Sequence, residues 1–137
     1  MSSGVKNILI VIGAIIAGSV VVFGIESISH IMFPPPSDLQ LDDMDSLKRY
    51  MPQAPAGSLA LLILAHAAGA LISGWIIGRF AHGDKRWLAM LTGVVWTFFG
   101  LINLVMIPHP IWFTIADICV YLPMTVLGVK LAAMQKT

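Results

Sequence analysis

The 137-residue sequence has little charge and a single cysteine. Charged residues make up 11% of the chain and hydrophobic residues 58%, which is far from the composition of an ordinary soluble domain. Cys119 is alone, so these residues contain no intramolecular disulfide and no Cys-x-x-Cys redox pair. The formal net charge is only +1 and gives no reason to expect a nucleic acid as partner. The sequence therefore argues against soluble, thiol-redox and nucleic-acid-binding classes.

Four long apolar runs occupy most of the chain. They cover residues 8–33, 58–77, 87–107 and 111–129. Each is close to the roughly 20 residues that a helix needs to cross about 30 Å of hydrocarbon. Short connections make consecutive helices antiparallel neighbours. We expect an all-α integral membrane protein, with residues 1–137 forming one domain of four transmembrane helices in an up-down-up-down bundle.

The basic residues predict the orientation of this bundle. Six of the eight fall on one side of it: Lys6, Arg79, Lys85, Arg86, Lys130 and Lys136. Only Lys48 and Arg49 fall on the other side. Because basic residues concentrate in cytoplasmic segments, we expect both termini in the cytoplasm and residues 34–57 as an outer loop. The expected location is the cytoplasmic (inner) membrane of a bacterium.

The expected outer loop carries signals for a short helix. Three consecutive prolines, residues 34–36, prevent the first helix from continuing. Ser37-x-x-Gln40 then fits a capping box. Apolar residues follow at helical spacing: Met44, Leu47 and Met51. We expect a short amphipathic helix on the outer surface, either as a lid over the mouth of the bundle or as a plain connector.

Each apolar run also carries a polar side chain. These include Glu26, His66, Asn103 and Asp117. An ionisable side chain at the bilayer centre costs at least about 2.5 kcal/mol, so something must offset that cost. We expect all four side chains to face the interior of the bundle, with Gly93 and Gly100 on the same face as Asn103.

His66 and Asp117 are the strongest pair in this set. Each lies 13 residues from a basic residue at the cytoplasmic edge, Arg79 or Lys130, so the helical rise of about 1.5 Å per residue puts both roughly 20 Å above that edge. A carboxylate at this position could fix the tautomer of the imidazole, stabilise its charge or bind a metal beside it. His66, Asp117 and Tyr121 are therefore the candidate catalytic residues.

Glu26-x-x-x-His30 adds a second carboxylate and imidazole on one helix face. With the first pair it gives the predicted metal ligands Glu26, His30, His66 and Asp117. Such a set suits a divalent first-row metal ion such as zinc. Three further polar residues are expected to support the site: Asn103, His109 and Thr114. The alternative is that these side chains only hold helices together or lie at the membrane interface.

Small residues follow His66 at four-residue intervals. Ala70, Gly74 and Gly78 lie on its helical face, and small-xxx-small stripes let helices approach closely. This face should turn His66 into the bundle or into a contact with a second copy or a larger membrane complex.

The residues support three functions. The leading hypothesis is an outward-facing intramembrane site that binds a metal cation or a proton, used in permeation, sensing or coupling. The second is a membrane-embedded enzyme acting on a lipid-like substrate through His66 and Asp117 as an acid-base or metal site. The third is an accessory subunit of a membrane complex, with purely structural polar residues. Membrane lipid is an expected partner in each case, and the sequence does not decide whether the chain is an enzyme.

Overall fold

The computed structural model describes residues 1–135, which form helices and their connections. The long helices are α1 (Ser3–Met32), α3 (Ala56–Phe80), α4 (Lys85–Met106) and α5 (Ile111–Met134). A short helix, α2 (Met44–Tyr50), and a 3-10 turn, η1 (Met51–Gln53), lie between α1 and α3. No strand occurs in residues 1–135, so the predicted all-α class is confirmed for the described chain.

All four long helices are long and apolar enough to cross a membrane. They match the predicted runs but extend beyond most of their ends, by as much as five residues at the start of α1 and at the end of α5. The runs were defined by apolar residues, whereas backbone hydrogen bonding continues into the polar turns at each end. Lys136, one of the basic residues used for orientation, lies outside the described residues.

The helix in the α1–α3 connection begins later than the capping box predicts. Asp43, and not Ser37, is the N-cap of α2, because its side chain accepts hydrogen bonds from the backbone N–H groups of Asp45 and Ser46. Asp is as effective an N-cap as Ser, and Ser46 Oγ also accepts from the backbone N–H of Gln40. The prediction of a helix start at Ser37 is therefore wrong.

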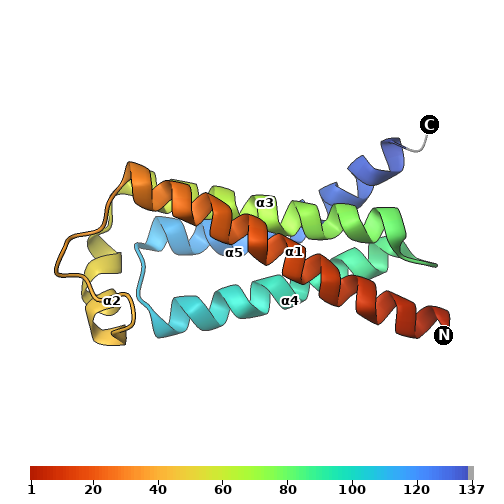
Figure 1. Ribbon diagram of the computed structural model, residues 1–137, viewed down its shortest axis with the longest axis horizontal. Coiled ribbons are helices and arrows are strands. Elements are labelled where there is room, and N and C mark those ends of the chain that lie inside the picture. The colour runs from red at the N-terminus through yellow and green to blue at the C-terminus, as the bar shows by residue number, and fades with distance from the viewer. Residues whose placement is uncertain (136–137) are drawn as a thin grey trace.

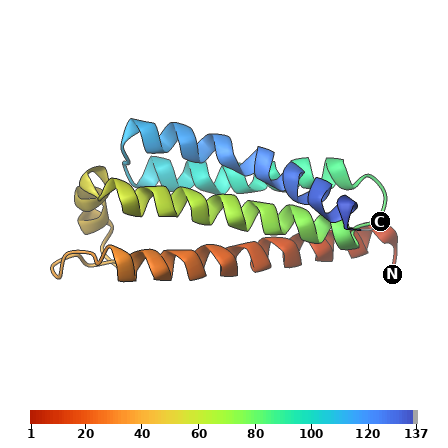
Figure 2. The same cartoon turned by 90° about the horizontal axis from the view of Figure 1, so that it is seen from above.

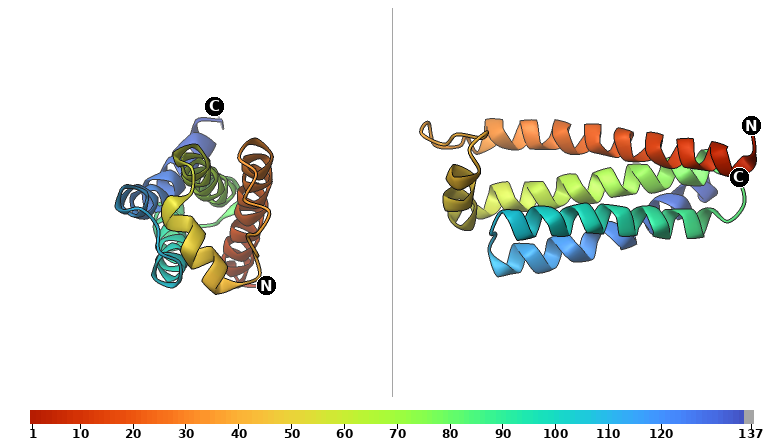
Figure 3. Two further views of the ribbon diagram at one scale, coloured as in Figure 1. Left: turned by 90° about the vertical axis from the view of Figure 1, so that its left-hand side faces the viewer. Right: turned by 90° about the horizontal axis from the view of Figure 1, so that it is seen from below.

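Helix α3 lies between α1 and α5, and α4 packs mainly on α5 (Figures 1 and 2). Consecutive long helices run in opposite directions in Figure 1, with the start of α1 and the end of α5 at the same end of the bundle. Helices α1 and α4 hardly touch. At the end that carries α2, this short helix lies across the bundle between α1 and α4 (Figure 3). We call this end the α2 end.

The contact between α3 and α5 sets the position of the candidate site. Gly74 lies against the backbone of Thr125, and Gly78 lies against Val129. The two residues of each pair are 51 positions apart in the sequence, and so are His66 and Asp117. The two helices therefore keep one register over several turns. The small-residue stripe is thus covered by α5 within the chain, which leaves other surfaces for any contact between copies.

Candidate functional site

His66 on α3 and Asp117 on α5 form the centre of the site. His66 Nδ1 lies 2.6 Å from Asp117 Oδ1, so the predicted proximity of the two side chains is confirmed. Tyr121, one turn after Asp117, donates its hydroxyl proton to Asp117 Oδ2 at 2.9 Å, and the same hydroxyl oxygen lies 2.9 Å from His66 Nδ1. We call His66, Asp117 and Tyr121 the triad.

The triad determines which ring nitrogen of His66 carries the proton. A carboxylate only accepts hydrogen bonds, and a neutral imidazole has one N–H, so Asp117 holds that N–H on Nδ1. Asp117 is only 2% exposed, whereas 18% of the His66 side chain is exposed. Within residues 1–135, Nε2 makes no hydrogen bond. Nε2 is therefore the nitrogen that can accept a proton or bind a ligand.

Two residues that the sequence did not single out support the triad. The Trp96 ring on α4 stacks on Tyr121, with centroids 6.2 Å apart and an interplanar angle of 9°. Trp96 Nε1 donates to Ser73 Oγ at 3.1 Å, and Ser73 in turn donates to the Ala14 carbonyl of α1 at 2.8 Å. All four long helices thus contribute to holding the Tyr121 ring in place.

The position of Trp96 along its helix indicates that this side chain faces the interior. Trp96 falls between Gly93 and Gly100 on the helical face that also carries Asn103, so it belongs to the predicted interior face. At Gly100 a Cβ would lie 2.7 Å from the Tyr121 ring, which means that glycine leaves room for this ring. Nothing in the sequence linked either position to Tyr121.

Three cavities share Glu26 in their lining, and two of them also border His66. The lateral cavity, about 230 Å³, lies among the four long helices. The central cavity, about 150 Å³, extends from His66 to α2 and η1. The loop cavity, about 170 Å³, lies beneath the α1–α3 connection. Glu26 lines all three, and His66 and Asn103 line the first two, so Glu26 is a wall that the three cavities share.

The lateral cavity opens through the side of the bundle. Phe23 on α1 and Phe99 on α4 stand at its rim, and they are 71% and 59% exposed. The two rings belong to helices that pack little against each other. The lateral cavity, which His66 also lines, therefore lies at the side of the bundle between α1 and α4.

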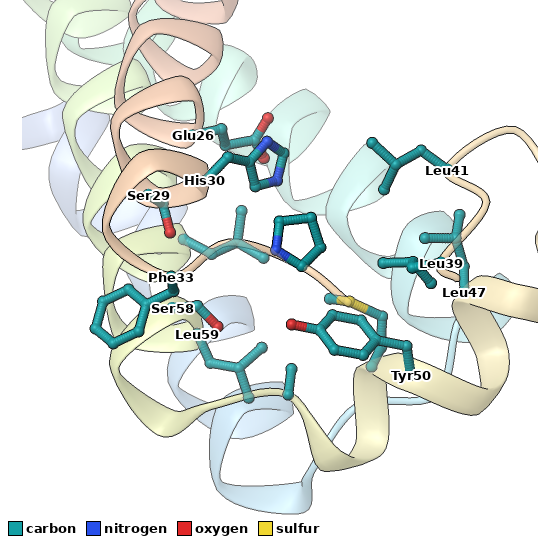
Figure 4. Close-up of a pocket in the computed structure, with 14 residues that line it drawn as sticks. Glu26, Ser29, His30, Phe33, Leu39, Leu41, Leu47, Tyr50, Ser58 and Leu59 are labelled. Carbon is teal, nitrogen blue, oxygen red and sulfur yellow. The ribbon is translucent and has the colours of Figure 1, made fainter. Parts of the chain in front are cut away.

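Glu26 and His30 lie on the α1 wall of the loop cavity. Figure 4 shows both side chains there, with Tyr50 of α2 on the opposite side. In the described chain neither side chain makes a hydrogen bond or an ion pair. Glu26 is half-buried and His30 is exposed. Glu26 shares two cavities with His66, whereas His30 lines only the loop cavity, so the predicted second pair is not joined to the triad.

The three residues that were expected to support the site, Asn103, His109 and Thr114, lie in three different surroundings. Asn103 lines the lateral and central cavities together with His66, and its side chain is exposed there instead of being packed against another helix. The small contact between α1 and α4 leaves it uncovered. Thr114 Oγ1 donates to the Pro110 carbonyl in the first turn of α5, which is a local structural role.

His109 lies in the connection between α4 and α5 and borders the central cavity. Its Nδ1 donates to the Ile107 carbonyl at 2.6 Å, and its ring stacks on Phe113 with centroids 4.7 Å apart. Burial lowers the pKa of His109 below its usual value of 6.5, although the hydrogen bond to Ile107 and the charge of Asp117 act in the opposite direction.

The predicted metal ligands do not form one ligand set. In residues 1–135, no group of three or more His, Cys, Asp or Glu side chains is placed to hold a metal ion. Both carboxylate oxygens of Asp117 are engaged within the triad. The predicted ligands Glu26, His30 and the Nε2 atom of His66 remain without a hydrogen bond in the described chain, but only Glu26 and His66 line the same two cavities.

Comparison with known proteins adds no functional information. No protein-family model, no curated protein and no solved structure matches this chain. The function must therefore be argued from the triad and the cavities beside it.

Proposed function

We propose that this chain is an integral membrane protein in which His66 exchanges a proton with the lateral cavity, for use in permeation, sensing or coupling. The observation that carries this proposal is the 2.6 Å contact between His66 Nδ1 and Asp117 Oδ1. A buried carboxylate that holds the imidazole N–H leaves the other nitrogen as a proton acceptor and stabilises the charge that protonation creates. Tyr121 completes the hydrogen bonding of Asp117, which keeps the carboxylate oriented.

The proposal includes an orientation in the membrane. We place both termini in the cytoplasm and the α2 end outside, in an up-down-up-down arrangement, because most basic residues gather at the opposite end. The central cavity, which extends from His66 to α2 and η1, would then lie between the triad and the outer surface. In this arrangement α2 is an outer-loop helix over the mouth of the bundle.

A divalent metal ion is the other cation that the sequence suggested. The ion would bind His66 through Nε2, and Asp117 would hold the other nitrogen of the imidazole ring. Glu26 would be a second ligand, since it lines the same two cavities as His66. A proton needs only Nε2, whereas zinc ordinarily takes three or four protein ligands. We therefore favour the proton, and elemental analysis of the purified protein tests the metal.

A membrane-embedded enzyme is the second candidate, and the side opening of the lateral cavity favours it. A lipid-like substrate could reach His66 Nε2 between Phe23 and Phe99, where the imidazole would act as a general base. Turnover of a co-purified lipid that stops in His66→Gln would support the enzyme over the coupling site.

The deciding experiment observes the His66 ring directly. Protein containing ¹⁵N-labelled histidine is reconstituted in lipid nanodiscs, and His66 is assigned by comparison with His66→Gln. We expect the Nδ1–H tautomer when the ring is neutral and protonation of Nε2 as the pH falls. Asp117→Asn should remove the tautomer preference, because a carboxamide can present either a donor or an acceptor to Nδ1.

Asp42→Asn is the matched control, since Asp42 is an exposed carboxylate in the α1–α3 connection. It should leave the His66 spectrum unchanged. If Asp117→Asn lowers thermal stability without changing the His66 tautomer or the pH dependence of unfolding, the triad is a structural contact. The accessory-subunit hypothesis would then replace the proposed function.

A further inference from the structure

Glu26 is the side chain that the triad leaves unexplained. It is a half-buried carboxylate on an apolar helix, it lines all three cavities, and no hydrogen bond or ion pair satisfies it in the described chain. The buried carboxylate of Asp117, by contrast, has a partner at each oxygen. A carboxylate directed at an open cavity in an apolar setting calls for a positively charged or hydrogen-bond-donating ligand.

Glu26 is the only carboxylate of the described residues that lines these cavities, and no permanently positive side chain lies beside it. Within the described residues no lysine or arginine lines any of the three cavities, and the basic groups there are histidines: His30, His66 and His109. Arg49 lines a separate hollow on the α1–α3 connection. Phosphate, sulfate and carboxylate headgroups would therefore face Glu26 with no fixed positive charge to balance them.

Aromatic rings provide a second, independent preference for a cation. Phe23, Trp96 and Phe99 line the lateral cavity together with Glu26. The face of an aromatic ring attracts a cation electrostatically within about 6 Å of the ring centroid. The same rings form an apolar path out of the bundle, because Phe23 and Phe99 are largely exposed at the rim.

We infer that the lateral cavity binds an amphiphilic amine, with its ammonium group beside Glu26 and its hydrocarbon chain leaving the bundle between Phe23 and Phe99. This inference rests on the proposed function, because the amine would be the ligand whose binding is coupled to the protonation of His66. Binding requires no covalent step. The ammonium group would be the partner that Glu26 lacks in the described chain, and the hydrocarbon chain would remain in the apolar phase beside α1 and α4.

The test uses three probes of one chain length. Nonylammonium, nonanol and nonanoate carry positive, neutral and negative headgroups, and each is measured by equilibrium dialysis against full-length protein in phosphatidylcholine nanodiscs, with empty nanodiscs as the baseline. We expect saturable binding of nonylammonium above the baseline, weaker binding of nonanol and none of nonanoate. Equal binding of the three probes would overturn the inference.

Two variants test whether the carboxylate of Glu26 is the group that binds the ammonium. Glu26→Gln keeps the shape of the side chain and should weaken nonylammonium binding by at least about tenfold while leaving nonanol binding unchanged. Asp42→Asn, which removes one negative charge outside the three cavities, should leave both unchanged. An unaltered affinity for nonylammonium in folded Glu26→Gln protein would refute the assignment of Glu26.

The His66 spectrum separates this inference from the proposed function. If nonylammonium does not bind but His66 retains its Asp117-dependent tautomer, only the amine assignment fails. If nonylammonium binds through Glu26 while Asp117→Asn leaves the His66 tautomer unchanged, the cavity binds amines but the proposed coupling to His66 fails.

Discussion

At the scale of single residues, the chemistry of the site depends on how completely Asp117 is hydrogen-bonded. His66 and Tyr121 each bond one oxygen of this carboxylate, and within residues 1–135 no buried side-chain polar atom lacks a partner. Such a network is stable only while all its members are present, since an unsatisfied buried charge is costly. The triad should therefore respond strongly to the loss of one hydroxyl group.

Replacing Tyr121 by Phe tests this dependence. The variant keeps the ring that stacks on Trp96 but leaves Asp117 Oδ2 without a donor, which should lower the free energy of unfolding by about 1–3 kcal/mol. Chemical unfolding in detergent measures the loss. Tyr50→Phe is the control, because the Tyr50 hydroxyl makes no hydrogen bond in the described chain, and a similar loss there would contradict the prediction.

His109 should contribute to the pH dependence of stability. Burial lowers its pKa in the folded protein below 6.5, so just below pH 6.5 the unfolded chain binds more protons at this residue than the folded chain does. The stability of the wild type should therefore fall as the pH drops through 6.5 and level off below the folded-state pKa. His109→Gln should lose less stability over this range in thermal unfolding, whereas His82→Gln, at an exposed turn, should behave like the wild type.

At the scale of helices, the register between α3 and α5 determines whether the triad forms. The close approach at Gly74 fixes how far the two helices can slide or separate, because its missing side chain is replaced by the backbone of Thr125. A side chain at residue 74 would push α5 away along a contact that extends towards His66. The packing at Gly74, two helical turns from His66, thus controls the distance between His66 and Asp117.

We expect Gly74→Ala to lower the free energy of unfolding by about 1–3 kcal/mol, the usual cost of overpacking, and to disturb the Nδ1–H tautomer of His66. Gly13→Ala is a matched control, because Gly13 is also helical but has open space where its Cβ would be. The control should be neutral or slightly stabilising, by up to about 1 kcal/mol. Equal effects of the two substitutions would show that backbone freedom, and not close packing, matters at Gly74.

At the scale of the whole molecule, the surroundings of α1 differ between its two ends. Near its start, the Asn7 side chain pairs with the backbone of His82, donating to its carbonyl and accepting from its N–H, both at 2.9 Å. Towards the α2 end, Glu26 faces cavities instead of a neighbouring helix. The cavities lined by Glu26 therefore lie towards the end of the bundle that we assign to the outer side.

The proposed orientation predicts the accessibility of single cysteines. In a Cys119→Ala background, a cysteine at position 43 in the α1–α3 connection should react with a membrane-impermeant reagent added to intact cells. A cysteine at position 84, in the α3–α4 turn, should react only after the membrane is opened. Labelling of both positions from the same side would exclude the proposed topology.

The sequence by itself determined the helical class, the four apolar helices and the proximity of His66 to Asp117. Hydrophobic length and helical rise are local properties, so counting residues from Arg79 and Lys130 was enough to place two side chains at one depth. The tertiary structure decided which helices touch, because positions along a single helix do not show which neighbour that helix packs against. The weak contact between α1 and α4 exposed Asn103 and opened the lateral cavity, whereas the tight contact between α3 and α5 covered the glycine stripe. Side-chain capping likewise decided the start of α2, since Ser37 and Asp43 are equally good caps in sequence and only the folded connection selects Asp43.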